Sequence, residues 1–153
     1  MGNHLNLISR GETMYKHILL AVDLTEDSKK IAIKAVELAK LSKAQFSVIH
    51  VQEPIRYAYA SEAPIDYSQV QTQIDGYAQK SLDEFVNSLD IKVENSLLES
   101  GKTSSSIREA AEELECDLIV VGSHGRHGFS LIFGSHSSGV IHGASCDVMA
   151  IRV

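Results

Sequence analysis

The chain has few cysteines and no excess of basic residues, and both shortages narrow its range of functions. Its 153 residues include two cysteines, Cys116 and Cys146. A chain of this length can bury a full core without disulfide bonds, so we expect two reduced, mostly buried thiols. The formal net charge is −6, and no segment concentrates Lys and Arg. Nucleic-acid-binding proteins normally carry a basic surface, so we expect no nucleic-acid partner.

Long apolar segments are also missing. Apolar runs such as residues 118–121 are far shorter than the ~20 residues that a membrane-spanning helix needs. The N-terminus lacks the charged region and apolar block of a secretory signal. We therefore expect a cytoplasmic protein with no membrane partner. Because Met14 directly precedes the first strand-like run, we interpret residues 1–13 as a disordered or added extension and residues 14–153 as one domain.

Proline is confined to one segment. Both prolines of the chain lie in residues 52–66, which show no steady hydrophobic period and are predicted to form a loop. Elsewhere, short apolar runs predict five strands, at residues 17–23, 46–51, 91–100, 117–122 and 147–153. Most of these runs are continuously apolar, which is typical of strands covered on both faces.

The segments between these runs have helical periodicity. Thr25, Asp27 and Ser28 are candidate N-caps for the first helix. The apolar stripe of the first helix contains Ile31, Ala35, Leu38 and Ala39. The stripe of the second contains Val70, Ile74, Tyr77, Ala78, Leu82, Phe85 and Leu89.

Two shorter helices are predicted further along the chain. Ser106 and Glu109 have the spacing of a capping box, and residues 135–142 read as a short helix. Strands joined by helices indicate a parallel sheet. We predict a single doubly wound α/β domain, with a five-stranded parallel sheet in the order 3-2-1-4-5 and helices on both faces.

The glycine-rich sequence GSHGRHGFSLIFGS, residues 122–135, follows the fourth predicted strand. In doubly wound sheets, ligands bind beyond the carboxyl ends of the strands. Glycines let backbone N–H groups turn toward an anion, and Gly134 and Ser135 stand at a helix start, which favours phosphate. Arg126 can add charge, and Asp23 at the end of the first strand can accept hydrogen bonds from a ribose.

A purely structural interpretation of the same residues stays open. The glycine loop can be a tight turn, Asp23 can cap the first helix, and His50 can be a hydrogen-bonded core histidine. The histidines have no H-x-x-x-H or C-x-x-C pairing, so we expect no metal held by protein ligands. A G-x-S-x-G motif is absent and no Lys follows Gly134, so we predict no catalytic residues and at most slow hydrolysis.

The segments LLAVDLTEDS, FSVIHV, CDLIVVGSHGRHG and CDVMAIRV together resemble the universal stress protein family, over residues 14–153. Its ATP-binding members carry G-x-x-G, a nine-residue spacer and then G-[ST]. The resemblance implies an adenine-nucleotide site for ATP or ADP, with Mg²⁺ held mainly through the phosphates. The residues implied are Ala21, Val22, Asp23, Phe46, Val121, Gly122, His124, Gly125, Arg126, His127, Gly134, Ser135, His136 and Ser137.

The resemblance also implies a role for each of these residues in the nucleotide site. The glycine loop and the helix start after it would hold the phosphates, and Asp23 would contact the ribose. Ala21 and Val22 would line the adenine side, and Phe46 would be the adenine-facing residue of the second strand. The sequence departs from the family pattern in its eight-residue spacer, 126–133, and in His136 and Ser137. Eight residues can span ~26 Å, so reach is no obstacle.

The resemblance also implies a homodimer through the final strand, residues 147–153. This strand is apolar and ends the chain, which favours pairing of its free edge. We therefore predict an ATP- or ADP-binding stress-response regulator with an unidentified regulatory protein partner. Two alternatives are a dimeric interaction module that has lost the nucleotide, with residues 52–66 as its partner surface, and a genuine ATPase.

Overall fold

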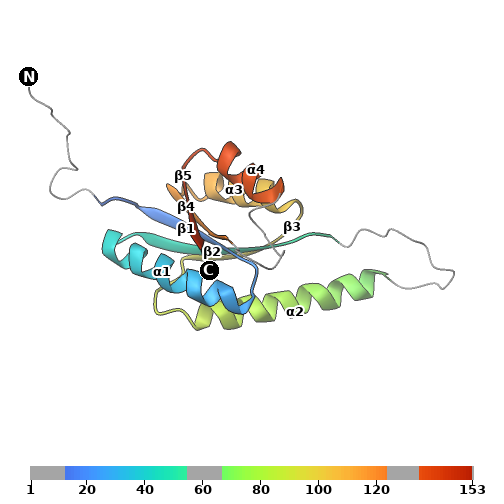
Figure 1. Ribbon diagram of the computed structural model, residues 1–153. Helices are drawn as coiled ribbons and strands as arrows, with labels where there is room; N and C mark the ends of the chain where they lie inside the picture. The colour runs from blue at the N-terminus through green and yellow to red at the C-terminus, as the bar shows by residue number, and fades with distance from the viewer. Residues whose placement is uncertain (1–12, 55–66, 124–134, 153) are drawn as a thin grey trace, which may run out of the picture.

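The computed structural model describes residues 13–54, 67–123 and 135–152, and contains four helices and five strands in these ranges (Figure 1). The predictions for residues 1–12 and 55–66 lie outside the described residues. The elements are β1 (His17–Val22), α1 (Glu26–Ser42), β2 (Gln45–Gln52), α2 (Tyr67–Asn87), β3 (Asn95–Ser100), α3 (Thr103–Glu113), β4 (Leu118–Ser123), α4 (Ser135–Gly143) and β5 (Asp147–Arg152).

The five strands form one parallel sheet in the order β3-β2-β1-β4-β5, which confirms the predicted fold. β1 lies in the middle, where Ile18 pairs with Phe46 of β2 on one side and with Leu118 of β4 on the other. Both neighbours run parallel to β1, so the carboxyl ends of the three strands meet at one edge of the sheet. This edge is the ligand-binding edge in folds of this type.

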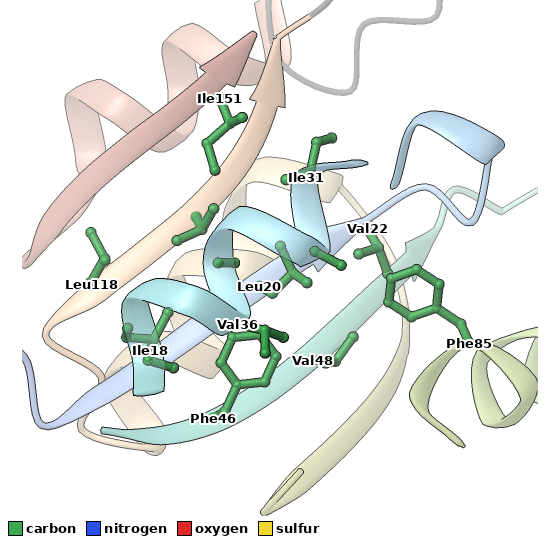
Figure 2. Packing of buried hydrophobic residues seen from close by; sticks show 14 of the residues in the cluster. Ile18, Leu20, Val22, Ile31, Val36, Phe46, Val48, Phe85, Leu118 and Ile151 are labelled. Carbon is green, nitrogen blue, oxygen red and sulfur yellow. The ribbon is translucent and has the colours of Figure 1, made fainter. Parts of the chain in front are cut away.

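Helices cover both faces of the sheet: α1 and α2 pack on one face, and α3 and α4 on the other (Figure 1). Alternate strand residues point to opposite faces, so the core is divided into two clusters. Figure 2 shows the cluster under α1 and α2, which includes Ile18, Leu20, Val22, Val48, Leu118 and Val120. The cluster under α3 and α4 includes Leu19, Ala21, Ile49, Val51, Ile119 and Val121. Full burial of each large aliphatic side chain contributes about 1.5–3 kcal/mol to stability.

The amino-terminal edge of the sheet is held by side chains that bond backbone groups. The carboxylate of Asp117 accepts the backbone N–H groups of Lys16 and His17, at 2.9 Å and 3.0 Å. Tyr15 donates its hydroxyl to Asp147 at 3.3 Å. These contacts tie the start of β1 to the starts of β4 and β5.

Two details of the helices differ from the sequence prediction. The predicted stripe of α2 is buried only at Ala78, Leu82 and Phe85, while Tyr77 is 73% exposed. The amino-terminal end of α2 extends past the strands in Figure 1, and Val70 near that end is 38% exposed. The predicted capping box at Ser106 is wrong, because α3 already begins at Thr103, where burial of the first turn fixes the helix start.

Both cysteines are free thiols within the cluster under α3 and α4, as expected from the composition. Cys116 is buried and Cys146 is half-buried. Burial, with smaller contributions from Cys146 and Asp117, raises the pKa of the Cys116 thiol to about 12. Burial also raises the pKa of the Cys146 thiol. Neither thiol therefore has the low pKa of a reactive cysteine.

None of the described helices has both the length and the apolar character needed to cross a membrane.

Candidate functional site

The candidate site lies at the carboxyl edge of the sheet, between β1 and β4. Because Leu20 of β1 pairs with Val120 of β4, the two strands bring Val22 and Gly122 to this edge together. Asp23 follows β1 immediately, and α4, the next described element after β4, begins at Ser135. The backbone N–H groups of the first turn of a helix lack partners within that helix, which favours an anion there.

The Asp23 carboxylate is bound by the first turn of α1. Its Oδ1 accepts hydrogen bonds from the backbone N–H of Thr25 at 3.0 Å, the Thr25 hydroxyl at 2.7 Å and the Ser28 hydroxyl at 2.6 Å. Thr25 is the N-cap residue, but its own side chain makes no capping bond to the helix. Asp23 therefore performs part of the capping role, as the structural interpretation of the sequence allowed, and its negative charge suits the helix N-terminus.

The backbone turns sharply directly after this carboxylate. Leu24 has φ of 61°, in the left-handed region that non-glycine residues rarely adopt. Such a conformation costs about 1–3 kcal/mol and persists only where the surroundings impose it. Leu24 is half-buried against the core, and the bonds of Asp23 to Thr25 and Ser28 close the turn.

His50 supports the same turn from β2. Its Nδ1 lies 2.8 Å from the backbone carbonyl of Val22, the residue beside it in the β1–β2 register. A carbonyl oxygen only accepts hydrogen bonds, so Nδ1 carries the proton and donates. His50 is hydrogen-bonded, as the interpretation as a core histidine expected, but it is half-buried rather than a core residue, and its bond fixes the backbone directly before Asp23.

The predicted adenine-lining residues lie on opposite faces of the sheet. Ala21 and Val121 are buried on the face covered by α3 and α4, whereas Val22 points into the core under α1 and α2. The prediction for Phe46 is wrong: it is fully buried beside Ile18, at the amino-terminal end of the sheet (Figure 2). A strand of eight residues places its first and last side chains too far apart for Phe46 to reach the carboxyl edge.

The β2 residue at the carboxyl edge is Val51, which the sequence analysis missed. Val51 is buried on the same face as Ala21 and Val121, and all three belong to the core cluster under α3 and α4. Val51 is the last residue of the segment FSVIHV, so the direction of the strand identifies this position from the sequence.

Gly122 has a packing role that needs no ligand. A Cβ atom built on Gly122 would lie 2.2 Å from Cδ1 of Ile31 on α1. Real Cβ atoms do not approach other atoms so closely, so a side chain at position 122 would force the terminal methyl of Ile31 to move, and glycine leaves room for it. The first glycine of the predicted phosphate loop is thus explained by helix packing as well as by phosphate binding.

The remaining predicted site residues divide into two groups. His124, Gly125, Arg126, His127 and Gly134 lie outside the described residues, as does the eight-residue spacer. The backbone of Ser135, His136 and Ser137 forms the first turn of α4, at the helix start that the sequence predicts. In the part of the chain that the structure describes, no three His, Cys, Asp or Glu side chains gather where they could hold a metal ion.

Comparison with known proteins shows which family the chain is similar to in sequence and in fold. The sequence model of the Universal stress protein family matches residues 14–152. Universal stress protein A homolog 1 of Coxiella burnetii is 38% identical over 139 residues, which cover 90% of this chain and 96% of that protein. The structure of universal stress protein UspA from Lactobacillus plantarum has a TM-score of 0.70 and 26% identity, and the match covers 90% of this chain and 98% of that one.

A second solved structure is that of a universal stress protein in complex with cAMP. Its TM-score is 0.56 and its identity 18%, over 90% of this chain and 96% of that one. At this identity the likeness shows the shared fold alone.

Proposed function

Because the chain belongs to the universal stress protein family, we propose that it is a cytoplasmic stress-response regulator that binds ATP or ADP. The observation that carries the proposal is the fixed Asp23 carboxylate at the carboxyl edge of β1, between the end of β2 and the end of β4. A carboxylate held at this edge is suited to accept hydrogen bonds from the hydroxyl groups of a ribose.

The other parts of the site have complementary chemistry. Ala21, Val51 and Val121 are the apolar residues that would lie nearest an adenine base at the carboxyl edge. The N-terminus of α4, beginning at Ser135, and the glycine loop before it would hold the phosphates. Mg²⁺ would be held mainly through those phosphates. A universal stress protein of the same fold has been solved with cAMP, which is an adenine nucleotide.

Calorimetric titration of the purified protein with Mg-ATP and Mg-ADP tests the proposal. We expect binding by the natural sequence, and a loss of at least about tenfold in affinity for Asp23→Ala. Asp23→Asn keeps an acceptor for the capping bonds and separates helix capping from the negative charge. Asp90→Asn, in the exposed turn after α2, is the matched control and should bind normally. Absence of binding at millimolar nucleotide, with none copurifying, would refute the proposal.

An interaction module that lacks nucleotide is the second candidate, and two observations favour it. Oδ1 of Asp23 already accepts three hydrogen bonds from the N-cap and first turn of α1, and Gly122 leaves room for the side chain of Ile31. Both residues therefore have structural roles without a ligand. The module hypothesis predicts that Mg-ATP leaves the melting temperature unchanged and that bulky substitutions at Gly125 and Gly134 have no effect on any nucleotide response.

We also propose that the protein is a homodimer through β5. β5 is the last strand of the sheet, and Met149 on it remains 36% exposed. An apolar edge strand of this kind favours pairing with a second copy. Sedimentation analysis of Met149→Lys should give a monomer. Val70→Lys on α2, at a side chain 38% exposed, is the control and should leave the dimer intact. A natural protein that sediments as a monomer would refute the dimer.

A further inference from the structure

Besides the two bonds that Thr25 makes to its carboxylate, Asp23 is restrained by Ser28 and His50, and neither of these belongs to the predicted nucleotide site. His50 comes from β2 and bonds the backbone immediately before Asp23. Ser28 comes from α1 and bonds the carboxylate itself. The two restraints meet at the turn where Leu24 adopts its left-handed conformation.

His50 fixes the path of the backbone. The bond from its Nδ1 to the Val22 carbonyl spans 2.8 Å between adjacent strands, at the last pair in the β1–β2 register. Beyond this pair the two strands have no further paired residues. The imidazole is therefore the last contact between β2 and β1 in that register before the chain enters the turn.

Ser28 fixes the rotation of the carboxylate. Its side chain is 1% exposed, and its hydroxyl donates to Oδ1 of Asp23 at 2.6 Å. The backbone N–H of Ser28 donates to the carbonyl of Thr25 at 3.0 Å, so the hydroxyl is carried on a closed helical turn. A short bond from a buried, well-held donor leaves the Asp23 side chain little freedom to change rotamer.

We propose that His50 and Ser28 are positioning residues that preorganise Asp23 for the nucleotide ribose without contacting the nucleotide. The identity of the ligand rests on the proposed function, whereas the restraint on Asp23 does not. A binding group that is already ordered loses less conformational entropy when the ligand arrives, so removing either restraint weakens binding even though no contact with the ligand is lost.

Substitutions with a conservative rescue test this inference by calorimetry. His50→Leu removes the donor at similar volume, and His50→Asn restores an amide N–H near the position of Nδ1. We expect about tenfold weaker Mg-ATP binding for His50→Leu and Ser28→Ala, and affinity within about threefold of the natural protein for His50→Asn. Ser42→Ala, which alters a buried serine in the last turn of α1, is the matched control and should bind normally.

Amide hydrogen exchange, measured by NMR without nucleotide, provides a readout that is independent of binding. The N–H of Thr25 donates to Oδ1 of Asp23, so its exchange should accelerate at least about tenfold in His50→Leu and Ser28→Ala. The N–H of Asp117, bonded to the His17 carbonyl at the opposite end of the sheet, should keep its rate.

The two experiments separate the inference from the proposed function. If the natural protein binds no nucleotide, the proposed function fails, and the exchange rate of Thr25 still decides whether Asp23 is restrained as inferred. Unchanged Thr25 exchange in both variants overturns the inference. Normal nucleotide affinity in both variants also overturns it.

Discussion

Replacing Ser47 by alanine should destabilise the fold by about 2 kcal/mol, because its hydroxyl links two side chains across the sheet. Ser47 lies on β2 and is fully buried. It is 2.8 Å from Nε2 of His17 on β1, and it accepts a hydrogen bond from Nδ2 of Asn95 on β3 at 3.0 Å. The other ring nitrogen of His17, Nδ1, lies 2.9 Å from the carbonyl of Leu114.

The direction of each bond follows from the chemistry of its partners. The Leu114 carbonyl can only accept, so Nδ1 of His17 donates to it. Nε2 of the neutral ring is then an acceptor, and the Ser47 hydroxyl donates to it while accepting from Asn95. Alanine at position 47 would leave the buried Nε2 without its donor. An unsatisfied buried group costs about 1–3 kcal/mol, and half-buried Asn95 can turn to water at a smaller cost.

Urea denaturation followed by circular dichroism, at one fixed protein concentration, measures this effect. Ser96→Ala, at an exposed serine on neighbouring β3, is the control and should cost under about 0.5 kcal/mol. In a double-mutant cycle, Ser47→Ala should cost about 1–2 kcal/mol less when His17 is already replaced by Leu, because no unsatisfied Nε2 then remains. A cost below about 0.5 kcal/mol for Ser47→Ala alone, or strict additivity in the cycle, would refute the hydrogen-bond assignment.

Three further perturbations test other parts of the structure. Gly122→Ala should destabilise the protein by about 1–3 kcal/mol through its clash with Ile31, and Ile31→Ala in the same chain should relieve part of that extra cost, as urea denaturation would show. Cys116 should react with a maleimide at pH 8 far more slowly in the native protein than in urea, because its thiolate forms only near pH 12; equal rates by mass spectrometry would contradict its burial. Asp117→Ala should cost about 1–3 kcal/mol in thermal unfolding, because two backbone N–H groups at the start of β1 lose their acceptor; an unchanged melting temperature would show that water replaces it.

The sequence predicted the sheet well because its strands are continuous apolar runs separated by helical periods. That alternation and right-handed crossovers indicate a doubly wound parallel sheet, but they do not by themselves choose among the strand orders of this class. Helix starts and buried lengths were predicted less well. The capping-box spacing at Ser106 is local, whereas the start of α3 at Thr103 depends on packing against distant segments: Thr103 bonds Glu53, and Ser104 lies against Gly139 of α4. The apolar stripe of α2 identifies the apolar face of the helix, but it does not show where along the helix the contact with the sheet ends.

Some residues of the candidate site were also predicted from the sequence, and others were not. Asp23 at the end of β1 and the start of α4 at Ser135 follow directly from the sequence pattern, and both lie at the predicted edge. Phe46 was assigned to the wrong end of β2, although the polarity of a parallel strand identifies Val51. The bond from His50 to the Val22 carbonyl was not predictable, because it depends on the register between two strands and on a ring orientation.

The central place of β1 has a consequence for how the protein is made. β1, β2 and β3 all lie within the first 100 residues, so they can pair with one another before the ribosome has synthesised β4, which begins at Leu118. Until β4 has been synthesised, as far as residue 123, the edge of β1 that will pair with β4 is unpaired and apolar. At about 5–20 residues per second, this interval lasts on the order of one to five seconds. A growing chain that exposes such an edge is a target for chaperones and for aggregation, and this exposure of β1 ends when β4 pairs with it.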